Sequence, residues 1–421
     1  MQQLTRRSLL GSTFAGGLLA GAGARAQQKA KLSAVWVGWT EPEVKPLMDA
    51  YAASHPDVDL AYERIPFAEM MQTLEVRLNA RTPLPDVFCT DGPLTGSYAV
   101  RGHLLDLTPS FGADKDRLTP AAWNQGTFRD RLYSAPFQSS SALLYANLKL
   151  LSAAGIEPPV ADIARRWTWE QVAEAAGKST DRSKGIWGFQ FEQTDRPYQL
   201  LPLPQSKGAK VISDDGLSVG DLFGKPEFLS SIQFYADLFN KNAVSPKGVY
   251  DFSLAREMFA TGRAALFVGG TWCVDQFKQN KDLEFAVAPF PGFAGGKPVT
   301  QTGSWHLGVN PRGKNIDKSI EFVRFMMSDR TQESWFKLRP APPILNSVWQ
   351  SLGSTFDTPA WRITRYELAN TAVPRPKTPG WREYEDLLRL AFRDIQGGAD
   401  VGPRMSRAAK DIDRELAKYR T

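Results

Sequence analysis

Cysteine and histidine are scarce in this sequence of 421 residues, which contains two cysteines and three histidines. Two cysteines cannot form a disulfide framework or a cysteine-based zinc site. The histidines His55, His103 and His306 are too few and too scattered to suggest a histidine-rich metal site. We therefore expect no metal and no cofactor, and we expect Cys89 and Cys273 to be buried thiols.

An excess of one charge and long apolar runs are also missing. Lys and Arg number 51 against 45 Asp and Glu, a formal net charge of +6, and residues 1–26 carry three arginines and no acid, so the chain without them stands at +3. That balance gives no reason to expect nucleic acid as a partner. After Gly23 no stretch approaches the ~20 apolar residues of a spanning helix. We expect a soluble mature protein with two domains, because one hydrophobic core rarely supports this length.

Motifs of common enzyme classes are absent as well. The sequence has no Gly-x-Ser-x-Gly elbow, no His-Glu-x-x-His, and no Gly-x-Gly-x-x-Gly after the first predicted strand. A glycosidase needs only two carboxylates, which 45 acidic residues could supply. No motif recommends catalysis, and an exported carbohydrate-active enzyme remains an alternative.

The amino terminus has the pattern of an export signal. A short basic segment, Met1–Arg7, precedes a mildly apolar stretch, and Ala24-Arg25-Ala26 supplies a small-x-small cleavage site. The pair Arg6-Arg7 followed by Ser-Leu-Leu resembles the twin-arginine signal, with a plain secretory signal as the alternative. We predict that residues 1–26 are removed and that the mature protein is periplasmic.

Strands and helices alternate at the start of the mature chain. The predicted order is strand, helix, strand, helix, strand, at Leu32–Trp36, Glu41–Ala53, Val58–Ile65, Phe67–Leu78 and Pro85–Cys89. This is the rhythm of an open parallel sheet, in which ligands bind beyond the carboxyl ends of the strands. The second half continues in the same style, without a low-complexity linker. Two domains without a linker should be joined by crossing segments, which we place at Tyr133–Leu144 and Ala288–Val299.

Tryptophan is plentiful, and three of the twelve fall where turns follow or precede strands: Trp39, Trp272 and Trp305. An aromatic ring beside glycines can present its face to a ligand, because glycine lets the backbone approach closely. Sugars offer an apolar face to such rings and hydroxyls to carboxylates and amides. Each of these rings could instead be a core or hinge-packing residue.

Several blocks together resemble the family 1 extracellular solute-binding proteins, the maltose-binding-protein-like subunits of ATP-driven sugar importers. The resemblance covers nearly the whole mature chain and rests on these segments: 35–43 with Ser54-His55-Pro56-Asp57-Val58, Pro85-Asp86-Val87, Ala135-Pro136-Phe137 with Leu144-Tyr145-Ala146-Asn147, Ala154-Gly155-Ile156 with Trp167-Thr168-Trp169-Glu170, 262–266 with Gly270-Thr271-Trp272, and 298–308.

The resemblance implies an α/β fold of two lobes around a central cleft, joined by hinge strands. Lobe 1 would comprise residues 27–138 and 296–345, and lobe 2 residues 139–295 and 346–421. A monomer would capture a sugar or oligosaccharide by closing on it and would deliver it to the membrane subunits of an ABC permease, without enzymatic activity. A binding protein for glycerol phosphate or other polyols and a receptor that signals to a membrane sensor are further alternatives.

Matching the family's blocks also gives candidate ligand contacts: Trp39, Thr40, Glu41, Asp91, Gln138, Ser139, Trp272, Ser304, Trp305 and, for a charged ligand, Arg375. Glu41 could instead be a first-turn helix carboxylate. Asp91 could be a helix N-cap, and Arg375 fits a surface turn. Ser304 departs from the family pattern, which has a second glycine at this position.

Overall fold

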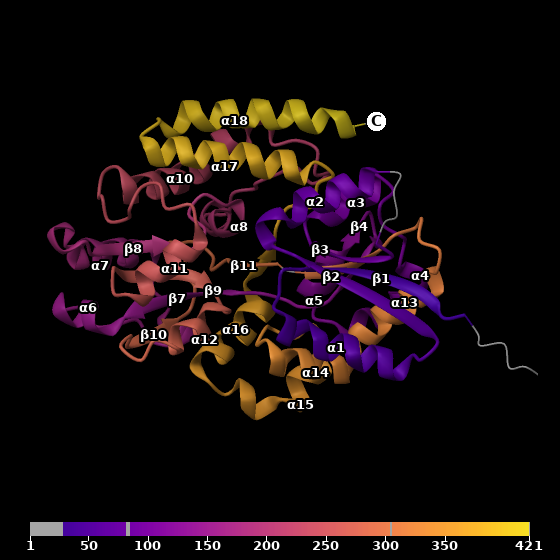
Figure 1. The fold of residues 1–421 in the computed structure, drawn as a ribbon. Coiled ribbons are helices and arrows are strands. Elements are labelled where there is room, and N and C mark those ends of the chain that lie inside the picture. The colour runs from indigo at the N-terminus through magenta and orange to yellow at the C-terminus, as the bar shows by residue number, and fades with distance from the viewer. Residues whose placement is uncertain (1–27, 81–84, 304, 421) are drawn as a thin grey trace, which may run out of the picture.

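The computed structural model describes residues 28–80, 85–303 and 305–420, and it shows two lobes, each built on its own β-sheet (Figure 1). The two-lobed α/β class predicted from the sequence is confirmed. The predicted signal peptide and the candidate residue Ser304 lie outside the described residues.

Lobe 1 is built on a five-stranded sheet in the order β2-β1-β3-β12-β6. Strands β1, β2 and β3 are parallel, and β12 runs antiparallel between β3 and β6. The strands are β1 Ala30–Val37, β2 Val58–Ile65, β3 Val87–Asp91, β6 Ser134–Pro136 and β12 Trp305–Val309, with the hairpin of β4 Thr127–Phe128 and β5 Arg131–Leu132 beside them. The helices around this sheet are α1 Glu41–Ser54, α2 Phe67–Asn79, α3 Leu94–Val100, α4 Thr108–Phe111, α5 Pro120–Gly126, α13 Ile316–Met326, α14 Asp329–Leu338 and α15 Asn346–Ser351.

Lobe 2 is built on a four-stranded sheet in the order β10-β7-β9-β8. The strands are β7 Ala142–Asn147, β8 Trp187–Phe191, β9 Ala264–Gly270 and β10 Phe285–Ala288. The remaining helices are α6 Leu148–Ala153, α7 Trp169–Ser179, α8 Pro197–Leu200, α9 Pro202–Ser206, α10 Pro226–Phe239, α11 Phe252–Ala260, α12 Cys273–Lys278, α16 Pro359–Asn370, α17 Trp381–Gly397 and α18 Val401–Leu416. Helices α17 and α18 lie along the top of Figure 1, where α17 also reaches α3 of lobe 1.

Crossing segments join the lobes without a flexible linker. The chain leaves lobe 1 between β6 and β7, inside the first predicted crossing, and returns between β10 and β12, overlapping the second. The two passages touch, because the Thr302 hydroxyl donates to the Ser140 carbonyl at 2.8 Å. A further pair of strands, β11 Thr300–Thr302 and β13 Ala372–Pro374, runs parallel in the same region and was not predicted. The bounds of the two predicted domains beyond these crossings stay a prediction.

The three strands predicted at the start of lobe 1 are all present, with bounds that match to different degrees. Strand β2 lies at the edge of its sheet, so it alternates exposed and buried positions, and its predicted bounds are those observed. The third strand was predicted two residues too early. Pairing of Asp91 with Trp305 across the antiparallel partner extends β3 through Thr90 and Asp91. In lobe 2, strand β10 is short, since only Phe285–Ala288 pairs with β7.

An aromatic cluster fills the core of lobe 1 beneath the cleft side of its sheet. The ring of Trp39 lies 4.6 Å from that of Trp335 and 5.7 Å from that of Phe137, measured between centroids. Trp36, which is fully buried on β1, packs against Trp39 at 5.8 Å. Because such rings bury large apolar areas, this cluster holds the loop after β1 rigidly against α14.

Candidate ligand-binding cleft

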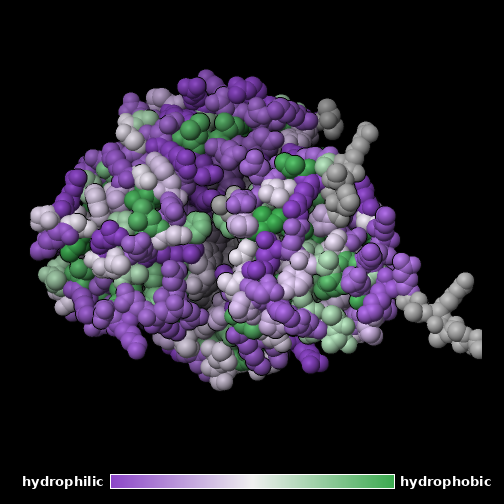
Figure 2. Space-filling model, in the orientation of Figure 1, coloured by the Kyte–Doolittle hydropathy of each residue, from purple (hydrophilic) through white to green (hydrophobic). Residues whose placement is uncertain are grey.

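Figure 2 shows a hollow between the two lobes on the face turned to the viewer. The carboxyl ends of β1 and β3 and the amino end of β12 share one edge of the lobe 1 sheet, as the pairing of Asp91 with Trp305 shows. The carboxyl ends of β8 and β9 are followed by Glu192 and Trp272 in lobe 2. Strand ends of open α/β sheets are where ligands bind.

The loop after β1 divides its three candidate residues between core and surface. Trp39 is only 5% exposed and belongs to the aromatic cluster, which favours the core alternative for this ring. Thr40 is exposed, and both its backbone N–H and its hydroxyl donate to the Glu43 carboxylate, at 2.6 and 2.8 Å. This bond fixes the start of α1 and keeps the Thr40 side chain oriented.

Glu41 is the first residue of α1, as its alternative interpretation required, and its side chain is also held from β2. The Tyr62 hydroxyl donates to one carboxylate oxygen at 2.6 Å, and Arg64 Nε lies 3.0 Å from the other. The negative charge of Glu41 is therefore already matched by a cation.

Asp91 and Arg375 form a buried, two-pronged ion pair. The two terminal nitrogens of Arg375 donate to the two carboxylate oxygens at 2.7 and 2.5 Å. The N-cap alternative for Asp91 is wrong, because α3 starts at Leu94 and follows Pro93.

The surface-turn interpretation of Arg375 is wrong as well. Its side chain is 9% exposed, and its guanidinium lies over the rings of Tyr198 and Trp381, at 5.0 and 5.7 Å. Burial lowers the pKa of Arg375, but Asp91, together with Glu385 and Tyr198, raises it, and the net pKa lies above its ordinary value. The side chain thus ties the segment after β13 to the end of β3.

Gln138 and Ser139 lie in the first crossing, as predicted, and both are buried. The amide oxygen of Gln138 accepts a hydrogen bond from Trp335 Nε1 at 3.1 Å. The Ser139 hydroxyl lies 3.4 Å from that of Thr302 in the returning passage. These contacts make both residues part of the hinge packing.

Trp272 stands on the lobe 2 side, directly after β9, and is partly exposed. Its ring stacks on Tyr198, with centroids 6.4 Å apart and planes 26° from parallel. Its indole Nε1 donates to the buried carboxylate of Glu192 at 2.7 Å. Tyr198 is buried, with the Arg375 guanidinium over its ring, so the partly exposed Trp272 is the ring of this pair that can offer a face to a sugar.

Trp305 lies on the opposite side, at the start of β12, and is half-buried. Its ring meets Trp39 edge-on at 6.2 Å and Phe67 at 5.8 Å. Phe67 also meets Phe252 of lobe 2 at 5.9 Å, and the guanidinium of Arg196 lies 5.7 Å from its centroid. The lobes therefore touch at the rim of the cleft, on one exposed phenylalanine.

Several of these residues were missed from the sequence: Glu192, Arg196, Tyr198 and Arg256 in lobe 2, and Phe67 and Phe252 at the rim. Glu192 comes directly after β8, in the same way as Asp91 was expected to come after the third strand. Applying the strand-end rule to the second sheet would have found it. No local signal marks Phe67 or Phe252 as partners, because their contact joins different lobes.

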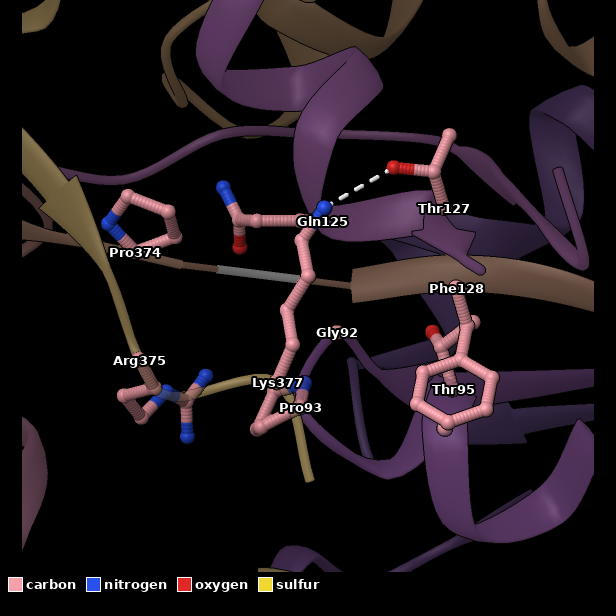
Figure 3. Close-up of a pocket in the computed structure, with 10 residues that line it drawn as sticks. Gly92, Pro93, Thr95, Gln125, Thr127, Phe128, Pro374, Arg375 and Lys377 are labelled. Atoms are coloured by element: carbon pink, nitrogen blue, oxygen red, sulfur yellow. Dashed lines mark hydrogen bonds between the residues drawn. The ribbon is translucent and has the colours of Figure 1, made fainter. Parts of the chain in front are cut away.

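Figure 3 shows a recess beside Arg375, lined by residues of α3, α5, β4 and the segment after β13. Lys377 crosses it and donates to the Thr127 hydroxyl at 2.9 Å. Burial lowers the pKa of Lys377. Arg375 and Gln125 form part of the wall of this recess.

Cys89 and Cys273 are free and buried, so the predicted thiols are confirmed. Burial raises the pKa of both. Within the described ranges, no group of three or more His, Cys, Asp or Glu side chains is placed to hold a metal ion. None of the helices in that part of the chain is long and apolar enough to cross a membrane.

Comparison with known proteins agrees with this geometry. The chain is 23% identical over 358 residues to the probable ABC transporter-binding protein of Deinococcus radiodurans, a match covering 82% of each chain. It is 30% identical over 234 residues to the maltodextrin-binding protein MdxE of Bacillus subtilis, and this match spans 51% of each chain.

The fold resembles the GacH receptor of Streptomyces glaucescens, with a TM-score of 0.80 and 21% identity over 93% of this chain and 100% of that one. Residues 38–333 match the family of bacterial extracellular solute-binding proteins, which is the family expected from the sequence blocks. The chain therefore belongs to the bacterial extracellular solute-binding protein family.

Proposed function

We propose that the protein captures a sugar or oligosaccharide between its lobes and delivers it to the membrane subunits of an ABC permease. The names of relatives support this, since they include a maltodextrin-binding protein, a maltotriose-binding protein and an ABC transporter-binding protein. The GacH receptor was solved in complex with acarbose. Binding, closure and release complete this function, so no bond of the ligand is made or broken.

The partly exposed ring of Trp272, which stacks on the buried Tyr198, carries the proposal. It lines lobe 2, while Trp305 and the loop of Thr40 and Glu41 lie on lobe 1. A ligand that touches both walls binds the closed form better than the open form and so shifts the population toward closure. The permease would then recognise the closed form.

Charge matching favours a neutral ligand over a glycerol phosphate. Three carboxylates of the cleft region each have an arginine partner: Glu41 with Arg64, Asp91 with Arg375, and Glu192 with Arg256. An anionic ligand would have to compete with these carboxylates for the arginines. The hydroxyls of a sugar need only acceptor lone pairs and N–H donors, and a carboxylate or guanidinium in an ion pair can still provide these.

Among the candidate residues, we propose that Trp272, Trp305, Thr40 and Glu41 contact the ligand directly. Asp91 and Arg375 would contact it as a pair, because neither is free of the other.

We further propose that residues 1–26 direct export, by the twin-arginine route, to the periplasm, where the mature protein acts as a monomer. The predicted division of the chain into 27–138 with 296–345 and 139–295 with 346–421 would give the two moving bodies.

A thermal-shift screen of residues 27–421 tests the function. The panel contains maltotriose, maltodextrins, galacto-oligosaccharides, diacetylchitobiose, polyols and glycerol phosphates. A ligand at a hundredfold excess over Kd adds about 2.7 kcal/mol to the free energy of unfolding, a rise in Tm of several degrees.

Trp272→Phe should weaken the response to the stabilising sugar, whereas Trp361→Phe should not. Trp361 packs in a separate cluster with Phe336 and Phe356, so it is the matched control. Stabilisation by glycerol phosphates alone would contradict the sugar assignment. Hydrolysis of oligosaccharides by the purified protein would contradict a binding-only role.

A further inference from the structure

Glu192 is a fully buried carboxylate in the wall of lobe 2, one residue beyond the end of β8. Burying an ionised carboxylate costs free energy unless it is paired and hydrogen-bonded. Its backbone is fixed as well, since its N–H donates to the Val268 carbonyl on the neighbouring strand β9 at 2.8 Å. A carboxylate placed so rigidly inside a wall of the cleft calls for a physical reason.

Every acceptor position of this carboxylate is occupied by the protein. One oxygen accepts from Trp272 Nε1 at 2.7 Å and from Arg256 Nε at 2.6 Å. The other accepts from the Gly270 backbone N–H at 3.1 Å and from Gln199 Nε2 at 3.3 Å. A carboxylate offers about four lone-pair sites. Glu192 therefore has no acceptor left for a ligand and can act only through its partners.

Trp272 is the aromatic partner, and it is partly exposed just beyond the carboxyl end of β9. An indole has a single polar atom, so one strong bond at Nε1 fixes the rotation of the whole ring. Gly270 allows the ring to lie flat on β9, because a Cβ at that position would stand 2.2 Å from the indole. The same carboxylate holds the Gly270 N–H, so ring and underlying strand share one anchor.

We propose that Glu192 is a positioning residue that fixes the plane of Trp272 before the sugar arrives. The proposal rests on the function above, in which Trp272 stacks on the sugar. A ring already ordered in the free protein loses less side-chain freedom on binding, so the ligand binds more tightly. The ring of Tyr198 stacks on that of Trp272 and so supports its orientation as well.

Arg256 extends the anchor toward the other lobe. Its guanidinium lies 4.9 Å from the centroid of Phe252, the ring that meets Phe67 of lobe 1. Burial lowers the pKa of Arg256, but Glu192 and Cys273 together raise it above its ordinary value, so the cation is retained. The Glu192 carboxylate thus orients both the ring of Trp272 and the side chain of Arg256, which supports the contact between the lobes at Phe252.

The test replaces Glu192 by Gln in the full mature protein labelled with 5-fluorotryptophan. The side-chain amide that Glu192→Gln introduces can point its NH₂ group in either of two directions. In one direction it faces the N–H donors of Trp272 and Arg256, and in the other those of Gly270 and Gln199, so one pair of donors loses its acceptor. Trp272→Phe assigns the ¹⁹F resonance of Trp272.

Trp169, fully buried in the same lobe, reports whether lobe 2 stays folded. Glu174→Gln, which removes an exposed glutamate paired with Lys178, is the matched control.

We expect the Trp272 resonance of the unliganded E192Q protein to shift or broaden while that of Trp169 stays in place. For the sugar that stabilises the wild type, Kd should rise about three- to tenfold, the effect of ordering one more side chain on binding. An E192Q resonance of Trp272 identical to the wild type would overturn the proposal, whether or not any sugar binds.

The outcomes separate this proposal from the proposed function. A wild type that responds to no sugar, with the Trp272 shift still present in E192Q, contradicts the function and leaves the positioning role supported. If the Trp169 resonance is lost in E192Q, lobe 2 has unfolded, and the Glu192→Asp variant is tested instead of E192Q. Aspartate keeps the negative charge on a shorter side chain. An unchanged Trp272 resonance in a folded E192D protein would then overturn the proposal.

Discussion

The Asp91–Arg375 pair allows a stability prediction worked from the structure. Asp91→Asn keeps the shape of the side chain but turns one acceptor into an NH₂ group that faces a guanidinium N–H. Arg375 cannot retreat into water, since it is 9% exposed and held between Tyr198 and Trp381. Removing one partner of a buried pair costs about 3–5 kcal/mol.

The size of the protein converts this cost into a temperature. Unfolding about 390 described residues as one unit releases roughly 0.8 kcal/mol/K of entropy, at about 2.1 cal/mol/K per residue. We therefore expect Tm to fall by about 4–6 °C in calorimetry, with a matching loss in urea denaturation. Asp49→Asn is the control, because its pair with Lys45 is exposed and worth about 0–1 kcal/mol.

The double variant Asp91→Leu with Arg375→Met sharpens the prediction. Replacing both charges by apolar groups removes the stranded guanidinium, so much of the loss should be recovered. A Tm change for D91N no larger than that of D49N would refute the reasoning. The reasoning would also be refuted if the double variant lost as much stability as Asp91→Leu and Arg375→Met lose separately when added together. The two side chains would then act independently.

Two further predictions concern the rim and the core of lobe 1. Phe67→Ala removes the ring that touches Phe252, so the bound sugar should dissociate about three- to tenfold faster in stopped-flow fluorescence. The control is Val76→Ala, an exposed change on the same helix, which should leave the dissociation rate unchanged. Equal dissociation rates for the two variants would contradict a role for the Phe67–Phe252 contact. His103 is buried, and burial together with nearby arginines lowers its pKa. Its folded-state pKa lies below the unfolded value, so its contribution to stability is complete above pH about 6.5 and is lost as the pH falls below it. Urea denaturation at pH 7 and pH 5 should show this loss in the wild type and less of it in His103→Leu, and an equal loss in both would assign the effect elsewhere.

Local patterns were enough to predict much of the fold. The strand Val58–Ile65 was predicted with its observed bounds. It lies at the edge of the sheet, where more exposed and more buried side chains largely alternate along the strand. Thr168 is the N-cap of the helix that starts at Trp169, and its hydroxyl accepts from the Gln171 N–H at 3.2 Å. Both features depend only on neighbours in the chain, so the sequence carries them in full.

The candidate site was less predictable, because its partners are far apart in sequence. Asp91 and Arg375 are separated by 284 residues, and neither looks paired in its own segment. Gln138 and Ser139 occupy the predicted crossing, but packing against the returning passage and Trp335 turned them into hinge residues. Family motifs locate such segments along the chain, whereas the direction of each side chain depends on tertiary contacts.

The place of β12 has a consequence for how the chain is made. This strand, Trp305–Val309, lies between β3 and β6, so residues from the first third of the chain cannot complete their sheet until residue 309 has been synthesised. Nearly three quarters of the polypeptide must leave the ribosome before the sheet of lobe 1 can include its antiparallel strand β12. Such long-range pairing slows folding and leaves strand edges open in the nascent chain. Lobe 2, whose four strands lie within residues 142–288, can assemble its sheet earlier, so the lobe that is translated first is completed last.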